Sequence, residues 1–156
     1  MTYTRIFEES WNRLIDDYRS GRFRPVNEYE VQCYLYHLCL LRLKEPRRIE
    51  VERGTNGMKV DLILGRQLFV ELKFTRTGTR KRRGPAKKWI KDVNKLSGLA
   101  AGTPPMFALF VEHPKGQGTN PVKADDVTPE FKNAVSQLRA TAEAKGVRVL
   151  LSFEEV

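Results

Sequence analysis

The segment from Lys59 to Lys73, KVDLILGRQLFVELK, reads as two short strands joined by a tight turn. Asp61 lies on the first strand, and Glu71 and Lys73 lie two residues apart on the second. Because side chains alternate between the two faces of a strand, Glu71 and Lys73 share one face. The opposite face is apolar and requires a core, with Leu68, Val70 and Leu72. The hairpin thus offers carboxylates on one side, and carboxylate oxygens are the ligands that Mg²⁺ prefers.

The length of the turn decides whether the two acids meet. A two-residue turn would direct Asp61 towards the apolar face. A three-residue loop at 65–67 would pair Leu64 with Leu68 and Asp61 with Glu71, whose Cβ atoms would then lie about 4.5–5.5 Å apart. A bulge would restore the same phase. We predict the three-residue loop or a bulge, because a slip of one residue would bury a carboxylate among apolar side chains.

A concentrated run of positive charge follows this hairpin. The chain carries a formal net charge of +9, and a basic balance suggests a polyanionic partner, nucleic acid first. The segment 76–91 contains no acid. Glycine and proline within it predict a mobile loop at 75–84. We expect its basic residues to contact phosphates: Arg76, Arg80, Lys81, Arg82, Arg83, Lys87, Lys88 and Lys91.

A helix predicted over 27–43 supplies a third candidate acid. Asn27 is a good N-cap, and Glu30 completes a capping box. Glu28 lies on the apolar stripe of this helix, where an acid needs a cation or a hydrogen-bonded partner. Its alternative role is that of a first-turn acid favoured by the helix dipole. The buried stripe is predicted to be Val31, Leu35, Leu38, Cys39 and Leu43.

The remaining elements follow from hydrophobic periodicity. We expect helices over 4–19, 85–100 and 129–145, and strands over 47–53, 59–64, 67–74, 106–112 and 147–153. The helix over 85–100 should bury Ile90, Val93, Leu96 and Ala100, and expose Lys88, Lys91 and Lys95 as a basic stripe. In the strand over 47–53, Ile49 and Val51 should face inward, which leaves Glu50 and Glu52 as reserve candidates for the acid role. This order predicts an α/β or α+β fold with a mixed sheet flanked by helices.

The chain of 156 residues suits one domain, 1–156, with 1–24 as an N-terminal helical extension. No apolar run is long enough for a membrane span, and acids stand where a signal peptide would be apolar. We therefore expect a cytoplasmic protein without a membrane partner. Cys33 and Cys39 share one predicted helix and are not expected to form a disulfide framework.

Glu-x-Lys occurs three times, but its context differs. Glu130/Lys132 and Glu143/Lys145 fall on a predicted helix, where residues i and i+2 face apart. Glu71/Lys73 has strand context and an acid on the preceding strand. With Asp61, Glu71-Leu72-Lys73 and Glu28, the chain resembles the PD-(D/E)XK nuclease superfamily, including its restriction-endonuclease-like order of elements from 27 to about 112. Val60 stands where the motif often has proline.

This resemblance implies divalent-metal-dependent hydrolysis of phosphodiester bonds. Asp61, Glu71, Glu28 and the Leu72 carbonyl would hold Mg²⁺, for which Mn²⁺ would substitute. Lys73 would orient the attacking water or stabilise charge on the phosphate. DNA is favoured over RNA as the substrate, and a DNA endonuclease is the preferred activity. A homodimer would suit the cutting of two strands.

Other interpretations stay open. The fold could serve as a non-catalytic nucleic-acid-binding module, as a structural protein of a ribonucleoprotein, or as an RNA-cleaving enzyme similar to tRNA-cleaving toxins. The acids and lysine could also form a purely structural ion pair, since such networks perturb pKa values without catalysis.

Overall fold

The structure is a computed structural model that describes residues 1–45, 48–55, 58–76, 86–99, 102–112 and 127–152. It contains four helices and five strands in these ranges. In chain order they are α1 (Tyr3–Arg19), α2 (Glu28–Arg42), β1 (Ile49–Thr55), β2 (Met58–Leu64), β3 (Leu68–Arg76), α3 (Ala86–Ser97), β4 (Met106–Glu112), α4 (Pro129–Lys145) and β5 (Arg148–Leu151).

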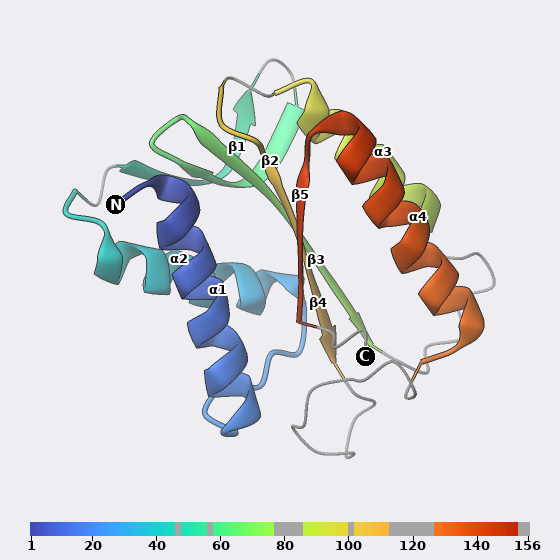
Figure 1. The fold of residues 1–156 in the computed structure, drawn as a ribbon. Coiled ribbons are helices and arrows are strands. Elements are labelled where there is room, and N and C mark those ends of the chain that lie inside the picture. The colour runs from blue at the N-terminus through green and yellow to red at the C-terminus, as the bar shows by residue number, and fades with distance from the viewer. Residues whose placement is uncertain (46–47, 56–57, 77–85, 100–101, 113–126, 153–156) are drawn as a thin grey trace.

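The strands form one mixed sheet in the order β1-β2-β3-β4-β5. β1, β2 and β3 are antiparallel neighbours, whereas β3, β4 and β5 run parallel. Helices α1 and α2 lie on one side of the sheet, and α3 and α4 lie on the other (Figure 1). The predicted α+β architecture with a mixed, helix-flanked sheet is therefore confirmed.

Each face of the sheet has its own apolar core. The core beneath α1 and α2 includes the inward residues Leu68, Val70 and Leu72 of β3, as the hairpin pattern predicts. The core beneath α3 and α4 includes Val60, Ile63 and Phe69. β4 is buried along nearly its whole length, which explains its continuous apolar sequence, since a strand covered on both faces needs no polar alternation.

Helix α1 packs on β4, the strand next to the centre of the sheet. Thr2 caps its N-terminus by accepting a hydrogen bond from the Arg5 backbone N–H. Trp11 and Tyr18 meet the Phe110 ring of β4 edge to face, with ring centroids 6.4 and 5.1 Å apart. Such aromatic pairs contribute about 0.5–1.5 kcal/mol beyond the area they bury. The first helix is thus part of the core.

Helix α2 begins as predicted but with one difference. The Asn27 side chain accepts a hydrogen bond from the Glu30 N–H at 2.9 Å. The predicted capping box would return the Glu30 carboxylate to the N–H of Asn27; instead this carboxylate accepts from the N–H of Val26 at 2.8 Å. Glu30 therefore has the local role expected of it, on the residue before the cap. The predicted apolar stripe of α2 is buried except at Leu43, which is half-buried.

The β2–β3 turn has the predicted length. Leu64 pairs with Leu68, so residues 65–67 form a three-residue loop. Gly65 and Arg66 both adopt positive φ, 59° and 57°, and the Gln67 N–H donates to the Leu64 carbonyl. The predicted pairing of Asp61 with Glu71 is wrong, however, because the regular ladder ends at Leu62 and Val70.

The β1–β2 hairpin is distorted at the same level. Its pairing passes over Glu52 and Asp61, and Glu52 adopts a φ of 49°. Val51, predicted to face inward with Ile49, is 40% exposed, so this expectation is wrong for Val51 and correct for Ile49. Periodicity assumes a regular strand, and the left-handed residue beside Val51 breaks that regularity.

Helices α3 and α4 complete the second layer. Val93 and Leu96 are buried as predicted, whereas Ile90 is half-buried and Trp89 takes the deeper position. Helix α4 ends at Gly146, whose φ of 68° provides a left-handed C-cap. Ala100 and residue 153 lie outside the described residues. Among the helices described, none is both long and apolar enough to cross a bilayer.

Candidate functional site

Beyond the end of the β2–β3 ladder, two acidic side chains accept hydrogen bonds from the backbone of β3. The Asp61 carboxylate accepts a hydrogen bond from the Leu72 N–H at 2.7 Å, and the Glu28 carboxylate accepts one from the Phe74 N–H at 3.2 Å. Leu72 and Phe74 are alternate residues of β3, so their N–H groups point to the same edge of the strand. The side chains thus replace the backbone partner that the departing strand no longer provides.

Gln32 fixes this arrangement from the next turn of α2. Its side chain is buried and donates to the Asp61 backbone carbonyl at 2.8 Å. The residue follows Glu28 by one helical turn, and its described contact is with Asp61. Helix α2 therefore holds both β2 and β3 at the point where they separate.

Lys73 lies at the centre of the acids. Its ammonium Nζ is 3.1 Å from Glu71 Oε1, 3.6 Å from Glu28 Oε1 and 3.5 Å from Asp92 Oδ2. Its side chain is only 10% exposed. The three contacts come from β3, α2 and α3, so this lysine joins elements from both layers. The predicted candidates Glu28, Glu71 and Lys73 are thus brought together, with Asp61 beside them on the Leu72 N–H.

Glu71 is engaged by a second lysine. Lys95 Nζ donates to Glu71 Oε2 at 2.7 Å and to the backbone carbonyl of Lys59 at 2.9 Å. Glu71 is only 4% exposed, so a charged carboxylate here requires such partners. Both of its oxygens therefore contact an ammonium group, one from Lys73 and one from Lys95.

The electrostatics of the group are strongly coupled. Burial, then the neighbouring Glu71 carboxylate, raises the pKa of Asp61 to about 6, although the Leu72 N–H and Lys73 oppose the change. Burial disfavours the charged form of Lys73, but the Glu71, Glu28, Asp92 and Asp61 carboxylates outweigh it and raise its pKa. Lys73 therefore stays charged at neutral pH, whereas Asp61 titrates close to neutrality.

Sequence reasoning missed Asp92 and misplaced Lys95. Asp92 contacts Lys73, and its Oδ2 is buried without a hydrogen bond among the residues described. On α3 it follows Trp89 by three residues, which puts it on the buried stripe. An acid on an inward helix face needs a partner, and this signal is present at Asp92 as it is at Glu28. The sequence predicts Lys95 on an exposed basic stripe, but it turns inward to Glu71.

The reserve acids lie elsewhere. Glu50 is 3.6 Å from Arg66, and Glu52 is 3.6 Å from Lys59. These two contacts lie on the β1–β2 side of the sheet and at the β2–β3 turn. Of these three acids, Glu28 is the one that contacts Lys73, at 3.6 Å and with a side chain that is 43% exposed.

The basic segment is described in part. Lys87, Lys88 and Lys91 are exposed on α3. Arg76 donates to Glu112 at 2.7 Å and to the Val26 carbonyl at 3.1 Å. The expected phosphate contacts at Arg80, Lys81, Arg82 and Arg83, and the predicted mobile loop around them, lie outside the described residues.

The fit of a divalent cation depends on donor type, charge and geometry. Four carboxylates (Asp61, Glu71, Glu28 and Asp92) and two ammonium groups (Lys73 and Lys95) leave a formal charge of −2 when all are ionised. Hard oxygen donors and this charge match Mg²⁺. In the arrangement described, however, no set of three acidic, histidine or cysteine side chains is placed to hold a metal within the described part of the chain. The oxygens face lysines instead.

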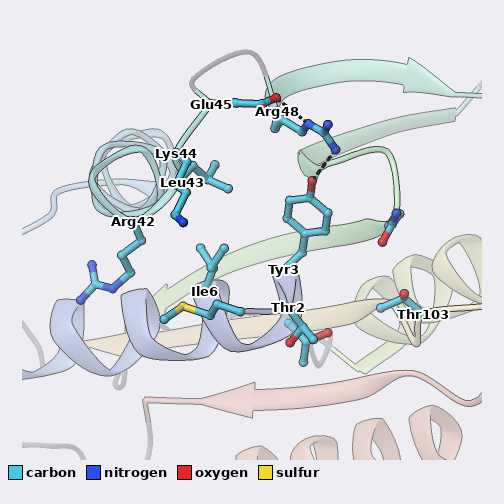
Figure 2. Close-up of a pocket in the computed structure, with 12 residues that line it drawn as sticks. Thr2, Tyr3, Ile6, Arg42, Leu43, Lys44, Glu45, Arg48 and Thr103 are labelled. Atoms are coloured by element: carbon cyan, nitrogen blue, oxygen red, sulfur yellow. Dashed lines mark hydrogen bonds and ion pairs between the residues drawn. The ribbon is translucent and has the colours of Figure 1, made fainter.

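A separate cavity of about 570 Å³ lies between the start of α1 and the end of α2 (Figure 2). None of the four acids lines it. Arg48 donates there to the Tyr3 hydroxyl at 3.0 Å and to Glu45 at 3.0 Å, and Arg42 donates to the Leu38 carbonyl. Both arginines already have hydrogen-bond partners, and the cavity is separate from the carboxylates that surround Lys73.

Comparison of the chain with protein-family models, with curated proteins and with solved structures found no match.

Proposed function

We propose that this protein is a divalent-metal-dependent nuclease of the PD-(D/E)XK type, acting on DNA in preference to RNA. The observation that supports this most is the convergence of Asp61, Glu71, Lys73 and Glu28 from two strands and a helix. The exposed lysines of α3, the helix that also supplies Asp92 and Lys95, add a basic surface next to this group.

Different residues of the site have different roles in the proposed reaction. Asp61, Glu71, Glu28 and the Leu72 carbonyl would hold Mg²⁺ or Mn²⁺. A bound cation supplies an activated water and neutralises charge on the phosphate. The Lys73 ammonium, kept charged by its acidic neighbours, orients the attacking water or donates to a phosphate oxygen as negative charge develops. Asp92 holds Lys73 from the α3 side.

The test uses a matched lysine pair. We expect wild-type protein to cut supercoiled plasmid or a four-way junction with Mg²⁺ or Mn²⁺, and not with EDTA. Lys73→Ala should lower the cleavage rate by about 100-fold or more while nucleic-acid binding persists. Lys145→Ala is the control, because it removes the lysine of a second Glu-x-Lys, on the exposed surface of α4. Equal rates for the two variants would refute the role of Lys73.

A second candidate is a non-catalytic nucleic-acid-binding module. It is favoured by the lysines that already neutralise the Glu71 oxygens, and by the use of Asp61 and Glu28 as backbone acceptors. It predicts binding that is independent of metal and unchanged in Lys73→Ala. Absence of cleavage on plasmid, junction and tRNA, with binding retained, would select this candidate over the nuclease.

A further inference from the structure

The ammonium group of Lys95 lies where its positive charge would repel a cation bound to Glu71. Its Nζ lies 2.7 Å from Glu71 Oε2, 2.9 Å from the Lys59 carbonyl oxygen and 4.0 Å from Asp92 Oδ1. These are three oxygen atoms from β3, β2 and α3. An ammonium group surrounded by carboxylate and carbonyl oxygens occupies the kind of environment that a hard metal ion also prefers.

The two lysines at Glu71 differ in how firmly they are held. Lys73 is 10% exposed and has three carboxylates within 3.6 Å of its Nζ. Lys95 is 21% exposed, and it donates hydrogen bonds to one carboxylate and one carbonyl. A lysine has a long, flexible stem whose charged end can move into water while the stem remains packed. Lys95 is therefore the more exposed of the two lysines, and its ammonium group has the shorter path into water.

We propose that Lys95 is a built-in counter-ion that competes with the divalent cation for Glu71. In the metal-free protein it neutralises this buried carboxylate and ties it to the Lys59 carbonyl. When the cation binds, Lys95 withdraws, because the cation and the ammonium group repel each other at the short distance that one carboxylate oxygen allows. This inference rests on the proposed function for the identity of the cation, and it adds a step that regulates occupancy of the site.

The first test measures Mn²⁺ binding by electron paramagnetic resonance, without nucleic acid. Lys95→Met keeps the stem and removes the repelling charge, so Mn²⁺ should bind on the order of 10–100-fold more tightly than in wild type. Lys91→Met is the control: it removes the same charge from an exposed position one turn earlier on α3 and should change the affinity less than about threefold, since exposed charges are screened. Unchanged or weaker binding in Lys95→Met, or no Mn²⁺ binding in any of the three proteins, would overturn the proposal.

A second measurement uses the unaltered chain and so does not depend on a variant that folds. Acetylation of lysine amines, followed by mass spectrometry, should show Lys95 protected in EDTA and several-fold more reactive with Mg²⁺. Lys91 should react equally in both conditions. Equal reactivity of Lys95 with and without Mg²⁺ would contradict its withdrawal.

The outcomes separate this proposal from the nuclease itself. Tighter Mn²⁺ binding in Lys95→Met, together with no cleavage by wild-type protein, would retain the competition and refute the nuclease. Metal-dependent cleavage with no change in Mn²⁺ affinity would refute the competition alone.

Discussion

Ionisation of the Asp61 carboxyl group is less favourable in the folded protein than in the unfolded chain. Its pKa rises to about 6 from an ordinary value of 3.8 because it is buried and lies near Glu71. The folded protein therefore binds a proton at Asp61 between these pH values that the unfolded chain releases. Stability from this residue is greatest at low pH and falls as the pH rises from the ordinary pKa through the raised one. At neutral pH the penalty amounts to about 3 kcal/mol at most.

Replacing Asp61 with asparagine should therefore stabilise the metal-free fold at neutral pH. The amide oxygen of the new side chain would still accept from the Leu72 N–H, without a buried charge. We expect Asp61→Asn to raise the free energy of unfolding by about 1–3 kcal/mol at pH 7.5, and the gain to shrink as the pH falls towards 4. Urea titrations in EDTA at several pH values measure this. Asp16→Asn, on the exposed side of α1, is the control, and an Asp61→Asn variant less stable than wild type at pH 7.5 would contradict the expectation.

At the scale of elements, the sequence predicts well what depends on local patterns. Local sequence signals predict the N-cap at Asn27, the end of α4 before Gly146 and the buried strand β4. Caps, turns and continuous burial each depend on residues that are close in the sequence. The separation of β2 from β3 is not predicted, since it begins at Asp61, at the level where the neighbouring strand has the left-handed Glu52, and neither feature changes the hydrophobic pattern. The error at Val51 follows from the left-handed Glu52 beside it, and the contact of Asp61 with the Leu72 N–H follows from the early end of the β2–β3 ladder.

Glycines at two element boundaries offer a matched comparison. Gly65 in the β2–β3 turn and Gly146 after α4 have similar positive φ, 59° and 68°. A side chain added at Gly146 meets open space, whereas one added at Gly65 would overlap the Tyr3 ring of α1. Gly146→Ala should cost about 1–2 kcal/mol of unfolding free energy for the left-handed backbone alone.

Gly65→Ala should cost about 1–3 kcal/mol more than that, because the α1 aromatic ring must also move. Urea denaturation of the two variants beside wild type measures the difference. Equal losses of unfolding free energy would mean that the Tyr3 ring does not limit the size of the side chain at position 65. The beginning of α1 would then be held mainly by other contacts.

On the scale of the whole molecule, the exposed lysines of α3 make the proposed nucleic-acid surface testable. Replacing Lys87, Lys88 and Lys91 with glutamine should weaken duplex binding and reduce the slope of log affinity against log salt concentration by about 0.9 per lost phosphate contact, or about 2.7 for three contacts. Fluorescence anisotropy across a salt series measures this slope.

A variant with the same loss of charge elsewhere provides the control. Lys44, Lys132 and Lys145 are exposed at the end of α2 and on α4. Their replacement by glutamine should leave the slope near that of wild type. Equal slopes for the two triple variants would mean that the positive charge acts as a diffuse field rather than through contacts at α3.

The acidic side chains that accept hydrogen bonds from the backbone of β3 would affect which residues are retained as the sequence of such a chain diverges. Asp61 and Glu28 each accept a hydrogen bond from a backbone N–H of β3 that would otherwise lack a partner beyond the end of the β2–β3 ladder. An unpaired buried donor costs about 1–3 kcal/mol. Selection for folding alone would therefore retain an acceptor at both positions in a descendant that had lost all chemistry. Lys73 makes no hydrogen bond to a backbone group among its described contacts, but it neutralises the buried Glu71 carboxylate. A descendant without catalysis would therefore be expected to lose Lys73 and Glu71 together.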